Sequence, residues 1–274
     1  MWEQRRHARL FSFLPVLFYT ALVKILVSND DGVFSPGLHA LALALSEVAD
    51  EVLVVAPDVE QSASGHAITV RRPLRYTPTQ LELPPNVTTF RVDGTPADCV
   101  VLGVHNGGRP DLVVSGINLG SNLGYDVTHS GTVAAAMEGT TMNIPSIAFS
   151  LRTGDADLDF AHAAAFAATF APRIAREGLP ERTLLNINFP VGKPKGVLLA
   201  RQSTHNWQDT VVAREDPEGV PYYWIAGKPV RSEQPDTDYM AVVGGYAAVT
   251  PLHLDMTHGS YFERLATFLP LEIA

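Results

Sequence analysis

The sequence has a single cysteine, Cys99, among 274 residues, so no disulfide can form within one chain. One cysteine is typical of a reducing compartment, which predicts a cytoplasmic location, and we interpret Cys99 as a small buried apolar residue. Basic residues are also scarce, because 20 Lys and Arg face 29 Asp and Glu, for a formal net charge of −9. Binding to DNA or RNA normally depends on a surplus of positive charge, so we expect no nucleic-acid partner.

The sequence also lacks an unbroken apolar segment long enough to span a membrane, and we expect no membrane partner. Its start, MWEQRRHARLFSFLPVLFYTALV, is similar to a signal peptide, but Pro15 interrupts the apolar run and no small-x-small cleavage site follows. We interpret residues 1–22 as an N-terminal extension produced by a misplaced gene start. A GTG codon at Val23 would then begin the protein.

Apolar residues make up 46% of the sequence and charged residues 18%, which suits a large globular α/β domain. Short apolar runs alternate with helical patterns, as in parallel βαβ units. The first helix begins at Ser35-Pro36, where serine suits the N-cap and proline the first helical position. The other patterns predict strands at 24–29, 51–58, 111–118, 144–151 and 183–190 and helices at 130–143 and 157–177.

After residue 190 the amino-acid composition changes, because proline and glycine become frequent. We expect a smaller lobe there, with a hairpin arm at 222–225 and strands at 241–252 interrupted by Gly244-Gly245. Four aromatic residues in this region could stack on a nucleobase, but aromatics in a hairpin arm more often bury against another subunit. We favour the second reading for Trp207, Tyr222, Tyr223 and Trp224.

The stretch ILVSNDDGVFSPG places two adjacent carboxylates, Asp30 and Asp31, directly after the first predicted strand. Such a pair repels itself unless a cation lies beside it, and oxygen ligands suit Mg²⁺ or Mn²⁺. Taken alone, the same residues also fit an exposed turn. In a parallel sheet, however, ligands gather beyond the carboxyl ends of strands, and two more polar clusters fall there.

The second cluster, APDVEQSASGHAIT, supplies the hydroxyls of Ser62 and Ser64, and the third, SGINLGSNLG, supplies Asn118 and Asn122. Further on, THSGTV places polar residues at a helix start, where free N–H groups and the helix dipole favour a phosphate. Each loop alone is a common turn. Together, on one edge of the sheet, they favour a pocket for a metal ion and a phosphate.

NDDG with SPG, APDVEQSASGHAIT, GTPADCV, PDLVVSGINLGSNLG, HSGTVAAAMEG and TPLHLDMT resemble, in order, the signature blocks of the SurE survival-protein family of metal-dependent nucleotidases. The resemblance covers nearly all of residues 23–257. It implies a Rossmann-like, mostly parallel catalytic domain at 23–190 and a β-rich region at 191–274 that serves oligomerisation. It also implies a homodimer or homotetramer that hydrolyses nucleoside 5′-monophosphates, with 3′-monophosphates and short polyphosphate as further substrates.

Carried over by position, the resemblance implies one Mg²⁺ or Mn²⁺ per subunit, held by Asp30, Asp31, Ser62 and Asn118. Asn122 and Ser130 match positions near the family's phosphate pocket. The residues that we expect to contact substrate are Asn29, Gly65, His66, Ser130, Gly131 and Thr132. The segment at 190–235 matches no block of the family, so substrate range and subunit contacts stay open.

The mechanism that we expect is attack of water on the phosphate, with charge stabilised by the metal ion, Asn122 and Ser130. Asp30 or Asp31 could accept the proton of water, and the sequence leaves that choice open. A haloacid-dehalogenase-type phosphatase is disfavoured, because Asn29 stands where its nucleophilic aspartate is needed. A dinucleotide-binding module is disfavoured as well, because no G-x-G-x-x-G follows the first strand.

Overall fold

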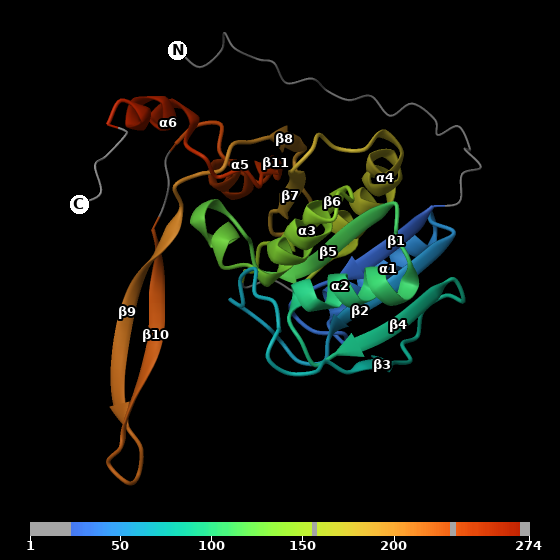
Figure 1. Ribbon diagram of the computed structural model, residues 1–274, viewed down its shortest axis with the longest axis horizontal. Coiled ribbons are helices and arrows are strands. Elements are labelled where there is room, and N and C mark those ends of the chain that lie inside the picture. The colour runs from blue at the N-terminus through green and yellow to red at the C-terminus, as the bar shows by residue number, and fades with distance from the viewer. Residues whose placement is uncertain (1–22, 155–157, 231–233, 269–274) are drawn as a thin grey trace.

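The computed structural model describes residues 23–154, 158–230 and 234–268 (Figure 1). The predicted extension at 1–22 lies outside these ranges. The main sheet contains β1 (Lys24–Ser28), β2 (Glu51–Pro57), β3 (Tyr76–Pro78), β4 (Val87–Val92), β5 (Leu112–Leu119), β6 (Ser146–Leu151), β7 (Thr183–Phe189), β8 (Val197–Leu199) and β11 (Ala247–His253). The helices are α1 (Pro36–Ser46), α2 (Pro96–Gly107), η1 (Gly124–Thr128), α3 (Gly131–Thr141), α4 (Ala161–Glu177), α5 (Asp238–Val243) and α6 (Gly259–Ala266).

Within the described residues, the main sheet has nine strands in the order β3-β4-β2-β1-β5-β6-β7-β11-β8. Its central strands are parallel, whereas β3 and β11 run antiparallel to β4 and β7. This mostly parallel sheet with flanking helices confirms the predicted α/β class. Among the residues that the structure describes, none of the helices combines the length and the apolar character needed to cross a bilayer.

Alternating residues of the central strands supply two hydrophobic cores, as the two-residue period of a strand requires. On β1, Ile25 and Val27 pack into a cluster with leucines of α1 and alanines of α4. Leu26 points to the opposite face, into a cluster that contains Cys99 of α2. Cys99 is fully buried there, as predicted. The sheet is therefore covered by helices on both faces.

The order of the strands reverses beside β1. The chain runs from β1 through α1 to β2 on one side, whereas β5 lies on the other side of β1. In doubly wound sheets, ligands bind at this switch point, beyond the carboxyl ends of the strands. The predicted clusters after β1 and β5 flank it.

The region after residue 190 does not stand wholly apart from the sheet. β8 and β11 join its edge beyond β7, whereas the hairpin of β9 (Asn206–Glu215) and β10 (Pro221–Val230) projects away from it, and α6, which has no buried residue, also lies apart from it (Figure 1). The expected hairpin arm at 222–225 lies in β10. One expectation is wrong: residues 241–243 belong to helix α5, which ends at Val243 with Gly244 as its C-cap, and a strand begins only at Ala247. The apolar run AVV is compatible with a strand or a helix. The helix forms because the backbone turns after Thr237, whose carbonyl accepts a hydrogen bond from Ala241 N–H.

The GTPADCV block starts helix α2 through a capping box. Thr95 Oγ1 accepts from Asp98 N–H at 3.1 Å, and Asp98 Oδ2 accepts from Thr95 N–H at 2.9 Å. The same two residues hold the preceding loop, because Thr95 Oγ1 donates to Ala67 O and Asp98 Oδ1 accepts from Thr69 N–H. The block thus fixes the loop between β2 and β3.

We expect Thr95→Ala to lower the free energy of unfolding by about 1–2 kcal/mol, because it removes the N-cap of α2 and the bond to Ala67 together. Thr169→Ala is the matched control, since the hydroxyl of the exposed Thr169 donates to Ala165 O of its own helix. Urea denaturation of both variants measures the difference. Equal stability of the two would contradict the capping role.

Candidate active site

Asp30 is buried at the end of β1, with 4% of its surface exposed, and points at the start of α3. Thr132 Oγ1 donates to Asp30 Oδ1, and the N–H groups of Thr132 and Gly131 also hydrogen bond to this carboxylate. Burial raises the pKa of Asp30, and these hydrogen bonds oppose the rise. The positive end of the α3 dipole therefore faces a carboxylate of the protein itself.

Gly131 allows this close approach. A Cβ at this position would lie 2.7 Å from Asp30 Cβ and 2.8 Å from Ser64 Oγ, both too short for real contacts. The start of α3, the end of β1 and the loop after β2 therefore meet at one point. Ser130, the N-cap of α3, accepts from Val133 N–H at 3.0 Å and fixes where the helix begins.

Asp31 lies beside the end of β5. Its Oδ2 accepts from Leu119 N–H at 3.1 Å, one residue after the predicted ligand Asn118. Burial raises the pKa of Asp31 to about 6; the Leu119 hydrogen bond opposes this rise, and the charges of Asp30 and Glu60 add to it. Asn118 Nδ2 donates to Gly120 O at 2.9 Å. This hydrogen bond does not engage the side-chain oxygen, which is the acceptor of the amide group.

The loop after β2 also reaches the acidic pair. Gln61 N–H donates to Asp30 O at 2.8 Å, which places the predicted ligand Ser62 next to the β1 terminus. Ser62 itself is exposed, and its Oγ donates to Glu60 Oε1 at 2.6 Å. Ser64 Oγ is buried beside Gly131 and has no hydrogen-bond partner among the described residues. The sequence predicts Ser64 as an oxygen donor, whereas no sequence pattern singles out Glu60.

The donor set suits a hard divalent cation. Two carboxylates whose pKa values are raised by burial, a serine hydroxyl and an amide oxygen are brought to one edge, and a cation would offset the cost of burying the charge. Within the described ranges, no three His, Cys, Asp or Glu side chains are grouped so that they could hold a metal ion. A metal ion here would therefore depend on the neutral oxygens of Ser62 and Asn118.

All six predicted substrate contacts already have partners in the protein. Asn29 is fully buried and donates from Nδ2 to Gly32 O at 3.0 Å and to Ser35 Oγ at 2.8 Å, so it holds the turn between β1 and α1. Gly131 and Thr132 bind Asp30, as described above. Ser130 keeps its own hydroxyl hydrogen available after capping α3. Contact of these residues with substrate stays a prediction.

Gly65 and His66 tie the loop after β2 to the residue that follows η1 and to α3, respectively. Gly65 N–H donates to His129 O at 2.9 Å, and His66 Nε2 lies 2.7 Å from Glu138 Oε2 on α3. His66 remains partly exposed beside the site, with 33% of its side chain accessible. Its contact with substrate also stays a prediction.

Asn122 is held in a buried hydrogen-bond network that no motif in the sequence predicts. Its N–H donates to Asn188 Oδ1 at 2.8 Å, and its carbonyl accepts from Asn186 Nδ2 at 2.9 Å and Asn188 Nδ2 at 3.1 Å. Its side-chain Nδ2 donates to Ser150 Oγ at 2.9 Å. The only signal in the sequence was two asparagines on the apolar strand TLLNINF, where buried polar groups need partners.

These features define a doubly wound α/β protein with an acidic, oxygen-rich site at the switch point of its sheet. The sequence matches the family model described as "Survival protein SurE" over residues 25–209. The chain therefore belongs to the SurE family, which confirms the resemblance seen in its motifs.

Relatives match over nearly the whole chain. The "5′-nucleotidase SurE 1" of Thermus thermophilus is 60% identical over 247 residues, which are 90% of this chain and 98% of that protein. The "5′-nucleotidase SurE" of Deinococcus radiodurans is 54% identical over 259 residues, which are 93% of this chain and 96% of that protein. The crystal structure of the SurE protein from Aquifex aeolicus matches with a TM-score of 0.75 at 41% identity and covers 89% of this chain and 99% of that one.

We expect Asp31→Asn to stabilise the metal-free protein above pH 6. Because the folded-state pKa of Asp31 is raised from 3.8 to about 6, the wild type loses stability as the pH rises through this window, and the amide variant avoids that loss. Asp31 is partly exposed, so the gain is on the order of 1–2 kcal/mol after allowance for solvent screening.

Chemical denaturation in EDTA at pH 4 and pH 7 checks this difference. Asp236→Asn, at an exposed carboxylate, supplies the baseline for the loss of one charge. The gain should appear at pH 7 and vanish near pH 4. A variant that is less stable than the wild type at pH 7 would contradict the electrostatic cost assigned to Asp31.

Proposed function

We propose that the protein is a divalent-metal-dependent 5′-nucleotidase that hydrolyses nucleoside 5′-monophosphates to nucleoside and phosphate. Nucleoside 3′-monophosphates and short polyphosphate are further substrates in this proposal. The names of the Thermus and Deinococcus relatives support the nucleotidase activity. The observation that carries the metal requirement is the contact of both predicted ligand loops with the acidic pair, through Gln61 and Leu119.

In this proposal Asp30, Asp31, Ser62 and Asn118 hold one Mg²⁺ or Mn²⁺, which when bound supplies positive charge to the phosphoryl oxygens. Asp30 is held by the start of α3, so its position follows from the fold. Ser130 can donate its hydroxyl hydrogen to a phosphate oxygen, and Asn122 fixes the backbone between Asn118 and η1. Water is the nucleophile, and one of the two aspartates accepts its proton.

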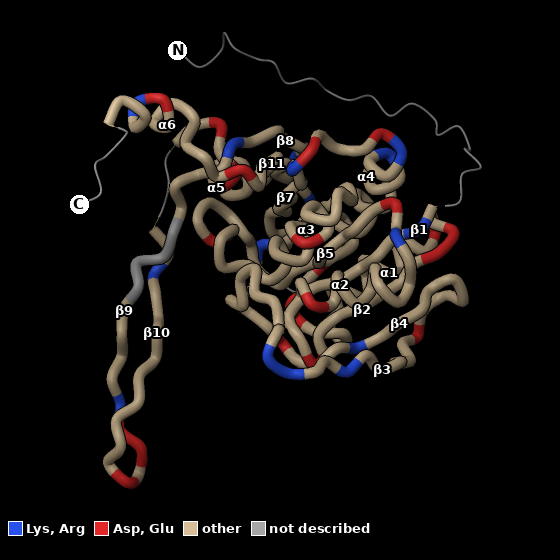
Figure 2. Tube along the Cα trace, in the orientation of Figure 1, with Lys and Arg blue, Asp and Glu red and all other residues tan. Residues whose placement is uncertain are grey.

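We also propose that the protein is a homodimer or homotetramer assembled through its C-terminal region. The β9–β10 hairpin carries charge mainly at its tip, and its arms are otherwise largely uncharged (Figure 2). Tyr223 and Trp224 are each 64% exposed and Ile225 is 81% exposed. Because side chains alternate along a strand, Tyr223 and Ile225 share one face of β10 and Trp224 lies on the other, so both faces expose apolar surface, which commonly marks an interface. The cytoplasmic location is part of the proposal, supported by the single buried Cys99.

The activity test is release of phosphate from AMP by the purified protein with Mn²⁺. We expect turnover with Mn²⁺, none with EDTA, and a loss of several orders of magnitude in Asp30→Asn, because the amide removes a metal-binding charge while it can still accept from Thr132. Circular dichroism and the melting temperature report whether this variant folds. Asp236→Asn should keep full activity, and near-normal turnover by Asp30→Asn would remove the site assignment.

The assembly test replaces Tyr223, Trp224 and Ile225 together by serine. Loss of this apolar surface should shift the protein towards the monomer in size-exclusion chromatography with light scattering, because the hairpin arm no longer buries apolar area. Leu43→Ser is the control, at an exposed apolar residue of α1. If the wild type is already a monomer at micromolar concentration, the proposed assembly is wrong.

A further inference from the structure

Residues 119–130, which we call the site loop, connect two parts of the candidate active site. The predicted ligand Asn118 precedes this loop, and Ser130, which caps the helix that holds Asp30, ends it. Because both ends of the loop belong to the site, any device that fixes its backbone also fixes the spacing of the site. One such device is the pair Asn186 and Asn188 at the position of Asn122.

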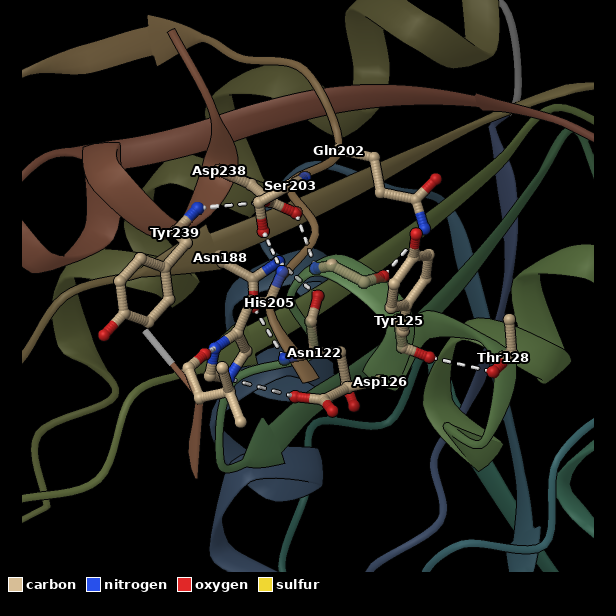
Figure 3. A network of polar contacts seen from close by, with 12 residues as sticks. Asn122, Tyr125, Asp126, Thr128, Asn188, Gln202, Ser203, His205, Asp238 and Tyr239 are labelled. Carbon is tan, nitrogen blue, oxygen red and sulfur yellow. Dashed lines mark hydrogen bonds and ion pairs between the residues drawn. The ribbon is translucent and has the colours of Figure 1, made fainter. Parts of the chain in front are cut away.

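A second device comes from the C-terminal region. Asp238, at the start of α5, is fully buried, and its carboxylate accepts three backbone N–H groups (Figure 3). Its Oδ1 accepts from Ser203 at 3.0 Å and from Tyr239 at 2.7 Å, both in the C-terminal region. Its Oδ2 accepts from Gly124 of the site loop at 3.0 Å.

The segment before β9 also forms hydrogen bonds at the carbonyl of Gly124 and at the residue that follows it. Gln202 Nε2 donates to Gly124 O at 2.7 Å, and Tyr125 N–H donates to His205 O at 2.8 Å. Gly124 has a φ of +56°, and a Cβ there would lie 2.4 Å from His205 O. Both backbone polar groups of Gly124 are therefore bound by side chains of the C-terminal region, from Gln202 before the hairpin and from Asp238 after it.

We propose that Asp238 is a positioning residue for the reaction: it fixes the site loop through Gly124 and so sets the place of Asn118 relative to Asp30. The role rests on the proposed nucleotidase function. The carboxylate suits it because a buried ionised acceptor binds N–H groups more strongly than a neutral one does, and two of its three donors anchor it to the C-terminal region. The C-terminal region then serves the site as well as assembly.

The variant that separates this contact from the others is Asp238→Asn. The amide oxygen can still accept from Ser203 and Tyr239, whereas its NH₂ group faces the Gly124 N–H and leaves two donors opposed. Asp236→Asn is the matched control, because Asp236 lies two residues before Asp238, is exposed, and loses the same charge in this substitution. Gln202→Ala removes the other hydrogen bond to Gly124, from an exposed position. Gln234→Ala is its control, because among the described residues the side chain of Gln234 accepts only from Thr204, in the same segment as Gln202.

We expect Asp238→Asn to lower kcat for AMP by about 10- to 100-fold, because a small displacement of the site is enough for such a loss. Mn²⁺ should bind several-fold more weakly, and backbone amides of residues 119–130 should exchange hydrogen faster by mass spectrometry. Gln202→Ala should change the same three quantities in the same direction, by less. The two control variants should match the wild type in all three.

Two results would overturn the proposal. One is an Asp238→Asn variant with a lower melting temperature but unchanged kcat, Mn²⁺ affinity and loop exchange, which would make Asp238 merely structural. The other, decisive where Asp238→Asn fails to fold, is a Gln202→Ala variant that matches Gln234→Ala in all three measurements. If the wild type releases no phosphate from AMP, the nucleotidase function fails by itself, while Mn²⁺ binding and hydrogen exchange still decide whether Asp238 positions the loop.

Discussion

The burial of two adjacent carboxylates at the end of β1 is the constraint on which the rest of the site depends. Asp30 is stabilised by the start of α3, through Thr132 and two backbone N–H groups. Among the residues that the structure describes, Asp31 has one such donor, from Leu119, and burial raises its pKa to about 6. The two acids thus differ. Hydrogen bonds from α3 offset part of the free-energy cost of burying the Asp30 charge, whereas the charge of Asp31 has less compensation from the protein.

This inequality determines how the surrounding elements are built. Helix α3 can serve Asp30 only if its first turn comes within hydrogen-bonding distance of β1, and GTVAAAMEG supplies small residues for that approach, with Ala134, Ala135 and Ala136 all buried. A helix packed this closely has little amphipathic pattern, because most of its length faces protein. The anion-binding end that a free phosphate would prefer is consequently occupied, and a substrate would meet Ser130 and the loop edges instead.

Local sequence predicted the sheet and the convergence of the loops, because both follow from short-range rules. Ser35-Pro36 is a local signal for the start of α1, and the carboxyl ends of parallel strands must share one edge. The partners of the polar groups were not predictable in this way. Asn188 and Asp238 lie 66 and 114 residues from the site-loop residues that they bind, and no periodicity connects them. Helix α5 was not predicted, because AVV suits a strand equally well and Thr237 makes no side-chain capping bond that would mark the start of the helix.

Residue 190 marks a change in amino-acid composition. The polar contacts of the site loop show that it does not mark a boundary between two structurally independent parts. β8 and β11 extend the main sheet, and Asp238 binds Gly124 from the far side of that boundary. Removal of the C-terminal region would expose Gly124 and leave two of its polar groups without their protein partners. An isolated fragment of 23–190 would therefore keep the acidic pair and lose one of the two supports that hold the loop between Asn118 and Ser130, so the site depends on the whole chain.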